Sequence, residues 1–149
     1  MSLKNLSVKN KIPDQYNIKF RNKRVNQIYN KFENSFKIDK NFVVAVSGGA
    51  DSLALAFLTR LFSFKNNLNP KYYIVDHKLR KGSTIEANKV KKILKSLNLN
   101  SQILTVRSKK PQNNIQSFAR KKRYDLLFSK SKKLKINNLV LGHHMDDLF

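Results

Sequence analysis

The residues best suited to chemistry lie at a single predicted strand-to-helix junction. An apolar, β-branched run at Phe42–Val46 predicts a buried strand, and the apolar segment Leu53–Phe62 predicts a helix packed against the sheet. Backbone N–H groups at the start of such a helix, together with its dipole, favour a phosphate group, and glycine lets the chain approach that anion closely. A simple tight turn uses the same residue types. The junction consists of Ser47, Gly48, Gly49, Ala50, Asp51 and Ser52.

Three common phosphate-site or nucleophile motifs are missing from the chain. It has no Gly-x-x-x-x-Gly-Lys-Ser/Thr of a Walker-type triphosphate site and no Gly-x-Gly-x-x-Gly of the usual dinucleotide fold. It also lacks the Gly-x-Ser-x-Gly of a hydrolase nucleophile elbow. Ser47–Ser52 after a hydrophobic strand instead resembles the PP-loop of the ATP pyrophosphatase superfamily, whose members release pyrophosphate and form an adenylylated intermediate.

Two further polar clusters follow predicted strands. One follows the run Lys71–Val75, and the other follows a run near Leu139–Leu141. Ligands of open α/β sheets bind at the carboxyl ends of the strands, so both clusters are candidates for the same site. Imidazole and carboxylate groups at this density also suit metal ions. The first cluster is Asp76 and His77, and the second is His143, His144, Asp146 and Asp147.

Two predicted helices carry charged residues near these clusters. Ser83 and Glu86 form a capping-box pattern, so we expect Glu86 to cap a helix rather than to act as a catalytic acid. Asn113 or Asn114 can cap the next helix, on which Arg120 and Arg123 share one side. A basic run on a helix is commonly a solvated face, but beside a phosphate site it can equally clamp an anion.

The alternation of predicted strands and helices indicates an α/β fold, a Rossmann-like parallel sheet with helices on both faces, as in PP-loop ATPases. Apolar residues at spacings of three and four predict a helix over 25–36 before the first strand, and a further strand is expected over 101–106. Residues 1–22 are polar and basic with no clear period, which predicts a flexible extension. Residues 23–149 then form one domain.

The composition limits the classes of function. The chain of 149 residues carries 31 basic and 9 acidic residues, a net charge of +22, which favours a polyanionic partner such as nucleic acid. Its richness in Lys, Asn and Ile would also arise in an AT-biased genome without any binding role. The absence of cysteine excludes disulfides, cysteine-bound metal and thiol-carried sulfur transfer within the chain. No apolar run approaches the ~20 residues of a membrane span, and we expect a cytoplasmic protein that binds no membrane.

Four motifs in order, spanning residues 42–149, resemble those of the tRNA(Ile)-lysidine synthase family. They are Ser47–Ser52; Val75–Arg80 with Ser83, Glu86 and Ala87; Asn114–Arg120 with Arg123 and Tyr124; and His143–Asp147.

The resemblance implies an enzyme that uses ATP to activate C2 of the wobble cytidine in a tRNA(Ile) with a CAU anticodon, and then joins L-lysine there. It implies that Ser47–Ser52 hold the ATP phosphates, with Asp51 helping to place Mg²⁺. It places Asp76 and His77 near the nucleotide, and Arg120 where it stabilises charge on the transferring phosphate.

The last motif is implied to bind the second substrate. His143, His144 and Asp147 would contact it, and Asp146 and Asp147 would face the lysine amine, where a carboxylate can orient a cation or accept its proton. The family's last motif continues past the second aspartate to a glutamate and a further helix and strand, and the family also has a C-terminal RNA-binding region. We therefore expect the catalytic domain to be incomplete at its C-terminus.

Other functions stay open. Another PP-loop adenylylating enzyme would act on a different substrate, and a catalytically incompetent fragment would only bind ATP or RNA. A metal-dependent phosphoesterase would pair Asp76 and His77 with the His143–Asp147 cluster around two metal ions. A non-enzymatic RNA-binding module is favoured by the charge alone. The sequence leaves the oligomeric state undecided, and a homodimer is one option.

Overall fold

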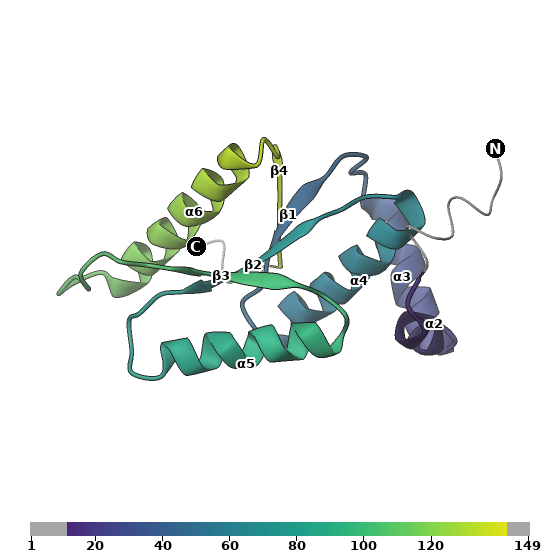
Figure 1. The fold of residues 1–149 in the computed structure, drawn as a ribbon, viewed down its shortest axis with the longest axis horizontal. Helices are drawn as coiled ribbons and strands as arrows, with labels where there is room; N and C mark the ends of the chain where they lie inside the picture. The colour runs from purple at the N-terminus through teal and green to yellow at the C-terminus, as the bar shows by residue number, and fades with distance from the viewer. Residues whose placement is uncertain (1–11, 143–149) are drawn as a thin grey trace.

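A four-stranded parallel sheet forms the centre of the computed structural model, which describes residues 12–142. The strands are β1 (Phe42–Ala45), β2 (Lys71–Asp76), β3 (Ser101–Thr105) and β4 (Asn138–Leu141). Their order in the sheet is β3-β2-β1-β4, and every neighbouring pair is parallel (Figure 1). The predicted α/β class with a parallel sheet is therefore confirmed.

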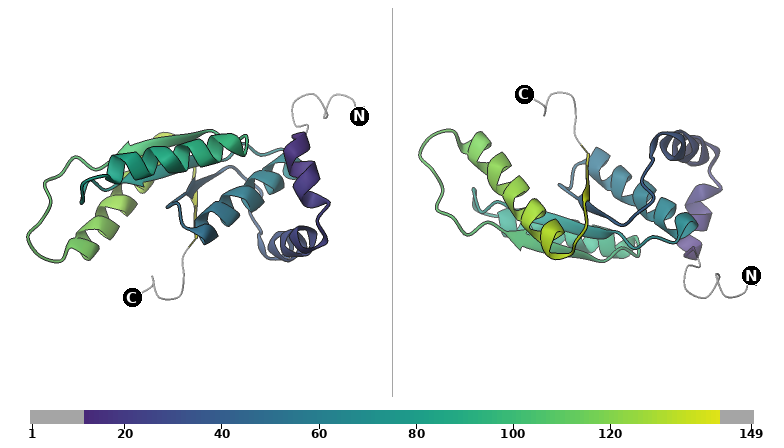
Figure 2. Two further views of the ribbon diagram at one scale, coloured as in Figure 1. Left: turned by 90° about the horizontal axis from the view of Figure 1, so that it is seen from below. Right: turned by 90° about the horizontal axis from the view of Figure 1, so that it is seen from above.

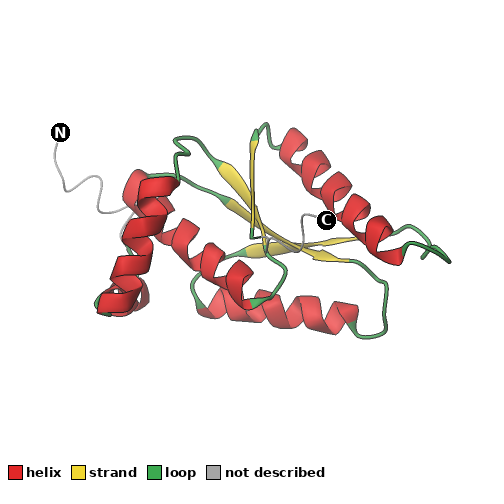
Figure 3. Ribbon diagram, turned by 180° about the vertical axis from the view of Figure 1, so that it is seen from behind, coloured by secondary structure: helices red, strands yellow, loops and turns green. Residues whose placement is uncertain are grey.

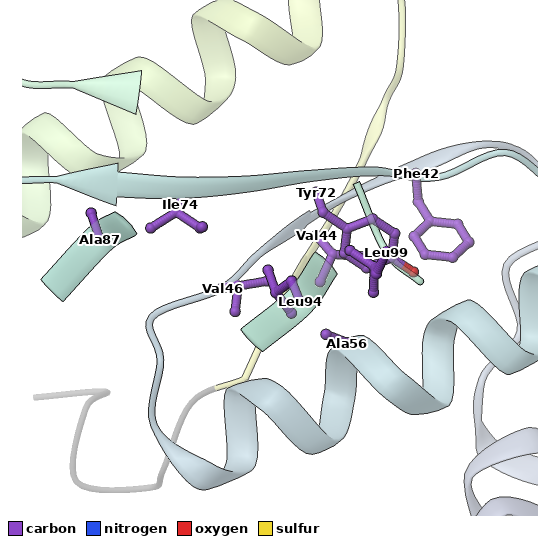
Figure 4. Packing of buried hydrophobic residues seen from close by; sticks show 9 residues of the cluster. All are labelled: Phe42, Val44, Val46, Ala56, Tyr72, Ile74, Ala87, Leu94 and Leu99. Atoms are coloured by element: carbon purple, nitrogen blue, oxygen red, sulfur yellow. The ribbon is translucent and has the colours of Figure 1, made fainter. Parts of the chain in front are cut away.

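Helices cover both faces of the sheet, as predicted. α4 (Ala50–Asn66) and α5 (Ser83–Ser96) pack on one face, and α6 (Ile115–Lys133) packs on the other (Figure 3). The division follows from side-chain alternation along the strands, because successive residues of a strand point to opposite faces. Val44 and Ile74 pack with Ala56 of α4 and Leu94 of α5 (Figure 4), whereas the neighbouring Val43 packs with Leu127 of α6.

The N-terminal part of the described chain forms two helices at one end of the molecule (Figure 2). α3 (Lys23–Ser35) matches the predicted helix, and its buried Tyr29 packs in one cluster with Leu61 and Phe62 of α4. Phe36 follows α3 and lies against both Phe42 of β1 and Phe62 of α4, with ring centroids 5.4 and 4.9 Å apart. The aromatic stripe of this helix is therefore core packing.

The prediction of a flexible extension is wrong for residues 14–20, which form α2 (Asp14–Phe20). Tyr16 of this helix is fully buried, and its ring stacks on Phe57 of α4 at 4.9 Å. Gln15 donates a hydrogen bond from its side chain to the carbonyl of Ser96 at the end of α5 (3.3 Å). The sequence gives no helical hydrophobic pattern here, because the helix has only seven residues and only one of them, Tyr16, is buried.

The capping box predicted for Ser83 and Glu86 is wrong, whereas Asn114 occupies the N-cap position of α6 as predicted. Gly82, with φ +94°, precedes α5, while Glu86 is paired with Arg80. Asn114 precedes α6 with φ +55° and makes no side-chain capping hydrogen bond. Asparagine tolerates this left-handed conformation, so its role here is conformational. Within the described residues, no helix combines the length and apolar character needed to cross a membrane.

Candidate functional site

A cavity of about 540 Å³ opens at the carboxyl ends of β1, β2 and β4, beside the N-terminal parts of α5 and α6. This is the edge where open parallel sheets bind ligands, and the volume lies within the ~300–1,000 Å³ of small-molecule sites. Three of the predicted site residues line it: Ser47, Asp76 and His77. Other wall residues are Leu79, Val90, Arg123 and Gly142.

The loop between β1 and α4 takes the form expected of a phosphate-binding turn. The N–H of Ser47 donates to Oγ of Ser52 (2.7 Å), and the N–H of Gly49 donates to Oγ of Ser47 (3.4 Å). The hydrogen-bond ladder of α4 begins with the N–H of Leu53, which donates to the carbonyl of Gly49 (3.0 Å). The N–H groups of the first turn of α4, before Leu53, therefore lie at the positive end of the helix dipole, where an anion is stabilised. Four loop residues are exposed there: Ser47, Gly49, Ala50 and Asp51.

Gly48 is the position where this loop requires glycine. Its φ is +96°, in the left-handed region, and a Cβ at this position would lie 2.6 Å from Cγ2 of Val90 on α5. Helix α5 thus packs directly on the loop backbone. At the end of β4, a Cβ on Gly142 would lie 3.3 Å from Cα of Ser52, so this strand also reaches the start of α4. The loop, α5 and the end of β4 therefore meet at one place.

Asp76 joins the end of β2 to the start of α5. The hydroxyls of Ser83 and Thr84 donate to its two carboxylate oxygens (2.7 and 2.8 Å), and the N–H of Lys78 adds a third hydrogen bond (3.1 Å). Burial by itself would raise the pKa of Asp76, but these hydrogen bonds and the nearby Lys78 ammonium lower it below its usual value. Asp76 is therefore ionised at neutral pH. The Ser83 hydroxyl anchors this carboxylate instead of capping its helix.

His77 and Arg123 supply polar groups to the cavity wall that the described protein leaves unpaired. Nδ1 of His77 and Nε of Arg123 are both buried and have no hydrogen-bond partner in residues 12–142. Burial lowers the pKa of His77, the charge of Arg123 lowers it further, and Asp76 opposes both effects. The net pKa lies below its ordinary value, so His77 is neutral at pH 7. It can therefore donate or accept a hydrogen bond but adds no charge.

The structure gives Arg123, rather than Arg120, a place in the cavity wall. Arg120 lies outside that wall, with its guanidinium 5.8 Å from the ring of Tyr124. The positions of the two arginines along the helix are consistent with this difference between Arg123 and Arg120. Arg123 is four residues from Ala119 and from Leu127, both buried, so it belongs to the row of α6 that faces the core.

Asp51 is the residue to which the family resemblance assigns Mg²⁺, and it lies in the described part of the chain. It is exposed in the first turn of α4, beside the loop amides. Mg²⁺ in nucleotide sites is commonly held by one or two carboxylates plus phosphate oxygens, so a single aspartate here fits such an ion. Across residues 12–142, no group of three or more His, Cys, Asp or Glu residues could hold a metal on its own.

The predicted second-substrate residues lie outside the described part of the chain: His143, His144, Asp146 and Asp147. Their roles stay predictions, as does the two-metal alternative that depends on them.

Together, the parallel sheet and the loop after its first strand define an α/β domain of the nucleotide-binding type. A family model for the PP-loop domain matches residues 19–149. The chain belongs to the PP-loop domain family.

Curated relatives of this chain are tRNA(Ile)-lysidine synthases. It is 37% identical over 126 residues to the enzyme of Rickettsia felis, in a match that covers 80% of this chain and 29% of that protein. It is also 37% identical over 110 residues to the enzyme of Bartonella henselae, covering 72% of this chain and 22% of that protein. The chain therefore spans less than a third of the length of these relatives.

Two solved structures share the fold. The U34-tRNA thiolase NcsA from Methanococcus maripaludis, with its [4Fe-4S] cluster, matches with a TM-score of 0.72 and 20% identity, over 83% of this chain and 46% of that one. The NH3-dependent NAD synthetase from Campylobacter jejuni matches with a TM-score of 0.52 and 24% identity, over 87% of this chain and 58% of that one. At these identities the likeness shows the fold alone, and this chain has no cysteine for a similar cluster.

The contact between Gly48 and Val90 predicts an unequal response of two glycines. Gly82 has nearly the same φ, +94°, but a Cβ there would meet open space, so Gly82→Ala should cost only the left-handed strain of about 1–2 kcal/mol. Gly48→Ala should lower the free energy of unfolding by a further ~1–3 kcal/mol, because the new methyl group collides with Val90. Urea denaturation measures both. Val90→Ala should remove most of this extra cost, whereas equal costs for the two glycines would contradict the contact.

The low pKa of His77 predicts a pH dependence of stability. Well above the ordinary histidine pKa of about 6.5, the imidazole is neutral in both the folded and the unfolded protein. It then adds no pH dependence to the free energy of unfolding. As pH falls below about 6.5, the unfolded chain takes up a proton that the folded chain resists, so the free energy of unfolding decreases until the folded pKa is passed. His77→Gln should flatten this decrease in urea denaturation between about pH 7.5 and 5. Equal slopes in the two proteins, or an NMR titration of His77 at or above its ordinary pKa, would count against the buried neutral imidazole.

Proposed function

We propose that this chain forms part of the catalytic domain of an enzyme that joins L-lysine to C2 of the wobble cytidine of a tRNA(Ile) with a CAU anticodon, using ATP. The observation that carries the proposal is the 37% identity to tRNA(Ile)-lysidine synthases over 80% of the chain. The geometry of the cavity supports it, because the loop of residues 47–52 and the cavity beside it suit a nucleoside triphosphate.

In this proposal the N–H groups of the first turn of α4, before Leu53, bind the phosphates of ATP. The adjoining cavity receives the adenosine, whose flat base suits the apolar side chains of Leu79 and Val90 in the wall. Asp51 holds Mg²⁺ against the phosphates, and this ion would neutralise part of their charge.

Polar residues of the cavity wall orient the reacting phosphate. Arg123 lines the cavity and carries a guanidinium that can bind phosphate oxygens, and neutral His77 offers a hydrogen bond without repelling that cation. Arg120 shares this task in the motif-based prediction, from its position one turn away on α6. Asp76 acts as a positioning residue, because it holds the start of α5 against the loop.

The proposed reaction has two steps that balance. The cytidine O2 forms a bond to the α-phosphorus of ATP, and the bond to pyrophosphate breaks. The lysine amine then bonds to C2 while the bond from C2 to the AMP oxygen breaks, and the amine gives up a proton. Asp146 and Asp147 are the proposed partners of that amine, from the part of the chain outside the described residues.

A second candidate is a PP-loop enzyme that adenylylates a different substrate. The fold likeness to an NAD synthetase and to a tRNA thiolase favours it, since those proteins act on unlike substrates within one fold. The AMP-forming step would be shared, and only the acceptor would differ.

Transfer of labelled lysine into bulk tRNA, measured with AMP release, tests the proposal in the full-length protein that contains this chain. Label in RNA that depends on ATP and Mg²⁺ is the expected result.

Asp51→Ala should lower the rate by about 100-fold or more, because it removes a group that organises charge on the phosphates. Asp125→Ala, which removes an exposed carboxylate on α6, should leave the rate unchanged. AMP release without labelled RNA would contradict the lysine assignment and favour the second candidate. The absence of both AMP release and labelled RNA would contradict both candidate functions.

A further inference from the structure

A second cavity, of about 290 Å³, lies at the opposite end of the sheet, where β2 and β3 begin. The proposed reaction leaves it unused, because the nucleotide site is at the carboxyl ends of the strands. Its volume falls below the range of drug-sized ligand sites, which favours a small ligand. Polar or charged side chains in its wall are Arg60, Asn69, Lys71, Asn100, Ser101 and Gln102.

Two buried polar atoms of this wall have no partner in the described part of the chain. They are Nε of Arg60 and Oγ of Ser101. A buried donor left unpaired costs about 1–3 kcal/mol, and such groups in folded proteins usually meet a water, an ion or a ligand. Two residues that line one small cavity, from different elements, each carry such an atom, which favours a ligand that accepts hydrogen bonds.

The charge of the wall is positive. Arg60 and Lys71 contribute two cations, and the wall residues include neither aspartate nor glutamate. The charge of Arg60 acts on the phenols of Tyr16 and Tyr72, but both phenols are neutral at pH 7, since burial raises the pKa of Tyr16 to about 12 and that of Tyr72 further. Within the wall, therefore, no acidic side chain offsets the charge of Arg60 and Lys71.

The Arg60 side chain and parts of the backbone around this cavity are held in place before any ligand binds. The guanidinium of Arg60 lies over the ring of Phe64, 4.2 Å from its centroid. Ser101 pairs with Tyr72 in the sheet, and the N–H of Asn69 donates to the side-chain oxygen of Asn41 (2.9 Å). A guanidinium fixed in this way can offer parallel N–H groups to an oxyanion without losing much side-chain entropy.

We propose that the cavity at the start of β2 and β3 binds a phosphate group. The phosphate belongs either to an RNA backbone or to a free phosphate ion, since both present the same tetrahedral oxygens. Arg60 and Lys71 neutralise its charge, and the Ser101 hydroxyl and the side-chain amides around it donate further hydrogen bonds.

An NMR titration of the protein with inorganic phosphate at constant ionic strength tests this proposal. Saturable shifts are expected at the Arg60 Nε–H and at the backbone amides of Ser101 and Gln102. The amides of Gly48 and Ser52 report separately on the nucleotide loop, so binding there is not mistaken for binding here. Unchanged Arg60 and Ser101 resonances throughout the titration would overturn the proposal.

A second titration, with bulk tRNA, separates the two sources of phosphate. If RNA fills the cavity, tRNA shifts the same resonances and weakens the apparent affinity for phosphate. If the ligand is a free phosphate ion, tRNA leaves these resonances in place and phosphate still binds. Both outcomes of the tRNA titration agree with the proposal, provided that inorganic phosphate binds in the first titration.

Variants establish whether the pocket or the general charge is responsible. Arg60→Gln should weaken phosphate binding about tenfold or more, because it removes a charged hydrogen bond. Lys91→Gln removes the same charge from an exposed site on α5 and should have no effect. If the packing on Phe64 prevents Arg60→Gln from folding, Lys71→Gln and Ser101→Ala test the same cavity. Equal weakening by Lys71→Gln and Lys91→Gln would show non-specific attraction and refute the site.

Discussion

The close approach of α5 to the backbone of Gly48 is the contact on which the cavity at the carboxyl ends of the strands depends. It is possible only because residue 48 has no side chain and adopts a φ of +96°. The same turn brings the N–H of Ser47 to the hydroxyl of Ser52 at the start of α4. The position of α5 is in turn set by the buried, ionised Asp76, which holds Ser83 and Thr84. Loop, helix and strand end therefore act as one unit, and a change in any of them would alter the space available to a ligand.

Much of the fold follows from local patterns that the structure bears out. The apolar runs at the four strands are bounded by polar or turn residues, and their alternation sends Val43 and Val44 to opposite faces. Glycine, serine and aspartate after the first strand indicated the loop, because few other residues suit a sharp turn into a helix. The positions of Asp76 and His77 were predictable for a similar reason, since the ends of parallel strands share one edge.

The errors arise where tertiary contacts override local patterns. α2 is too short for a period, and its burial depends on a single ring, Tyr16, stacked on Phe57. Ser83 matched a capping box, but the buried charge of Asp76 is the stronger acceptor and takes the Ser83 hydroxyl. The role of Arg120 stays a prediction from motif position, and the core-facing row of α6 adds Arg123, which lines the cavity. The unpaired groups of Arg60 and Ser101 lie far apart in sequence, so no local pattern could join them.

We propose that the loop of residues 47–52 and the cavity beside it form one site for a nucleoside triphosphate. A crystal structure of the protein with a non-hydrolysable ATP analogue would show whether they do. The phosphates are expected against the N–H groups at the start of α4, with the adenosine in the cavity between the ends of β1 and β2 and within reach of Arg123. Phosphates bound away from this loop, or an adenosine outside the cavity, would contradict it.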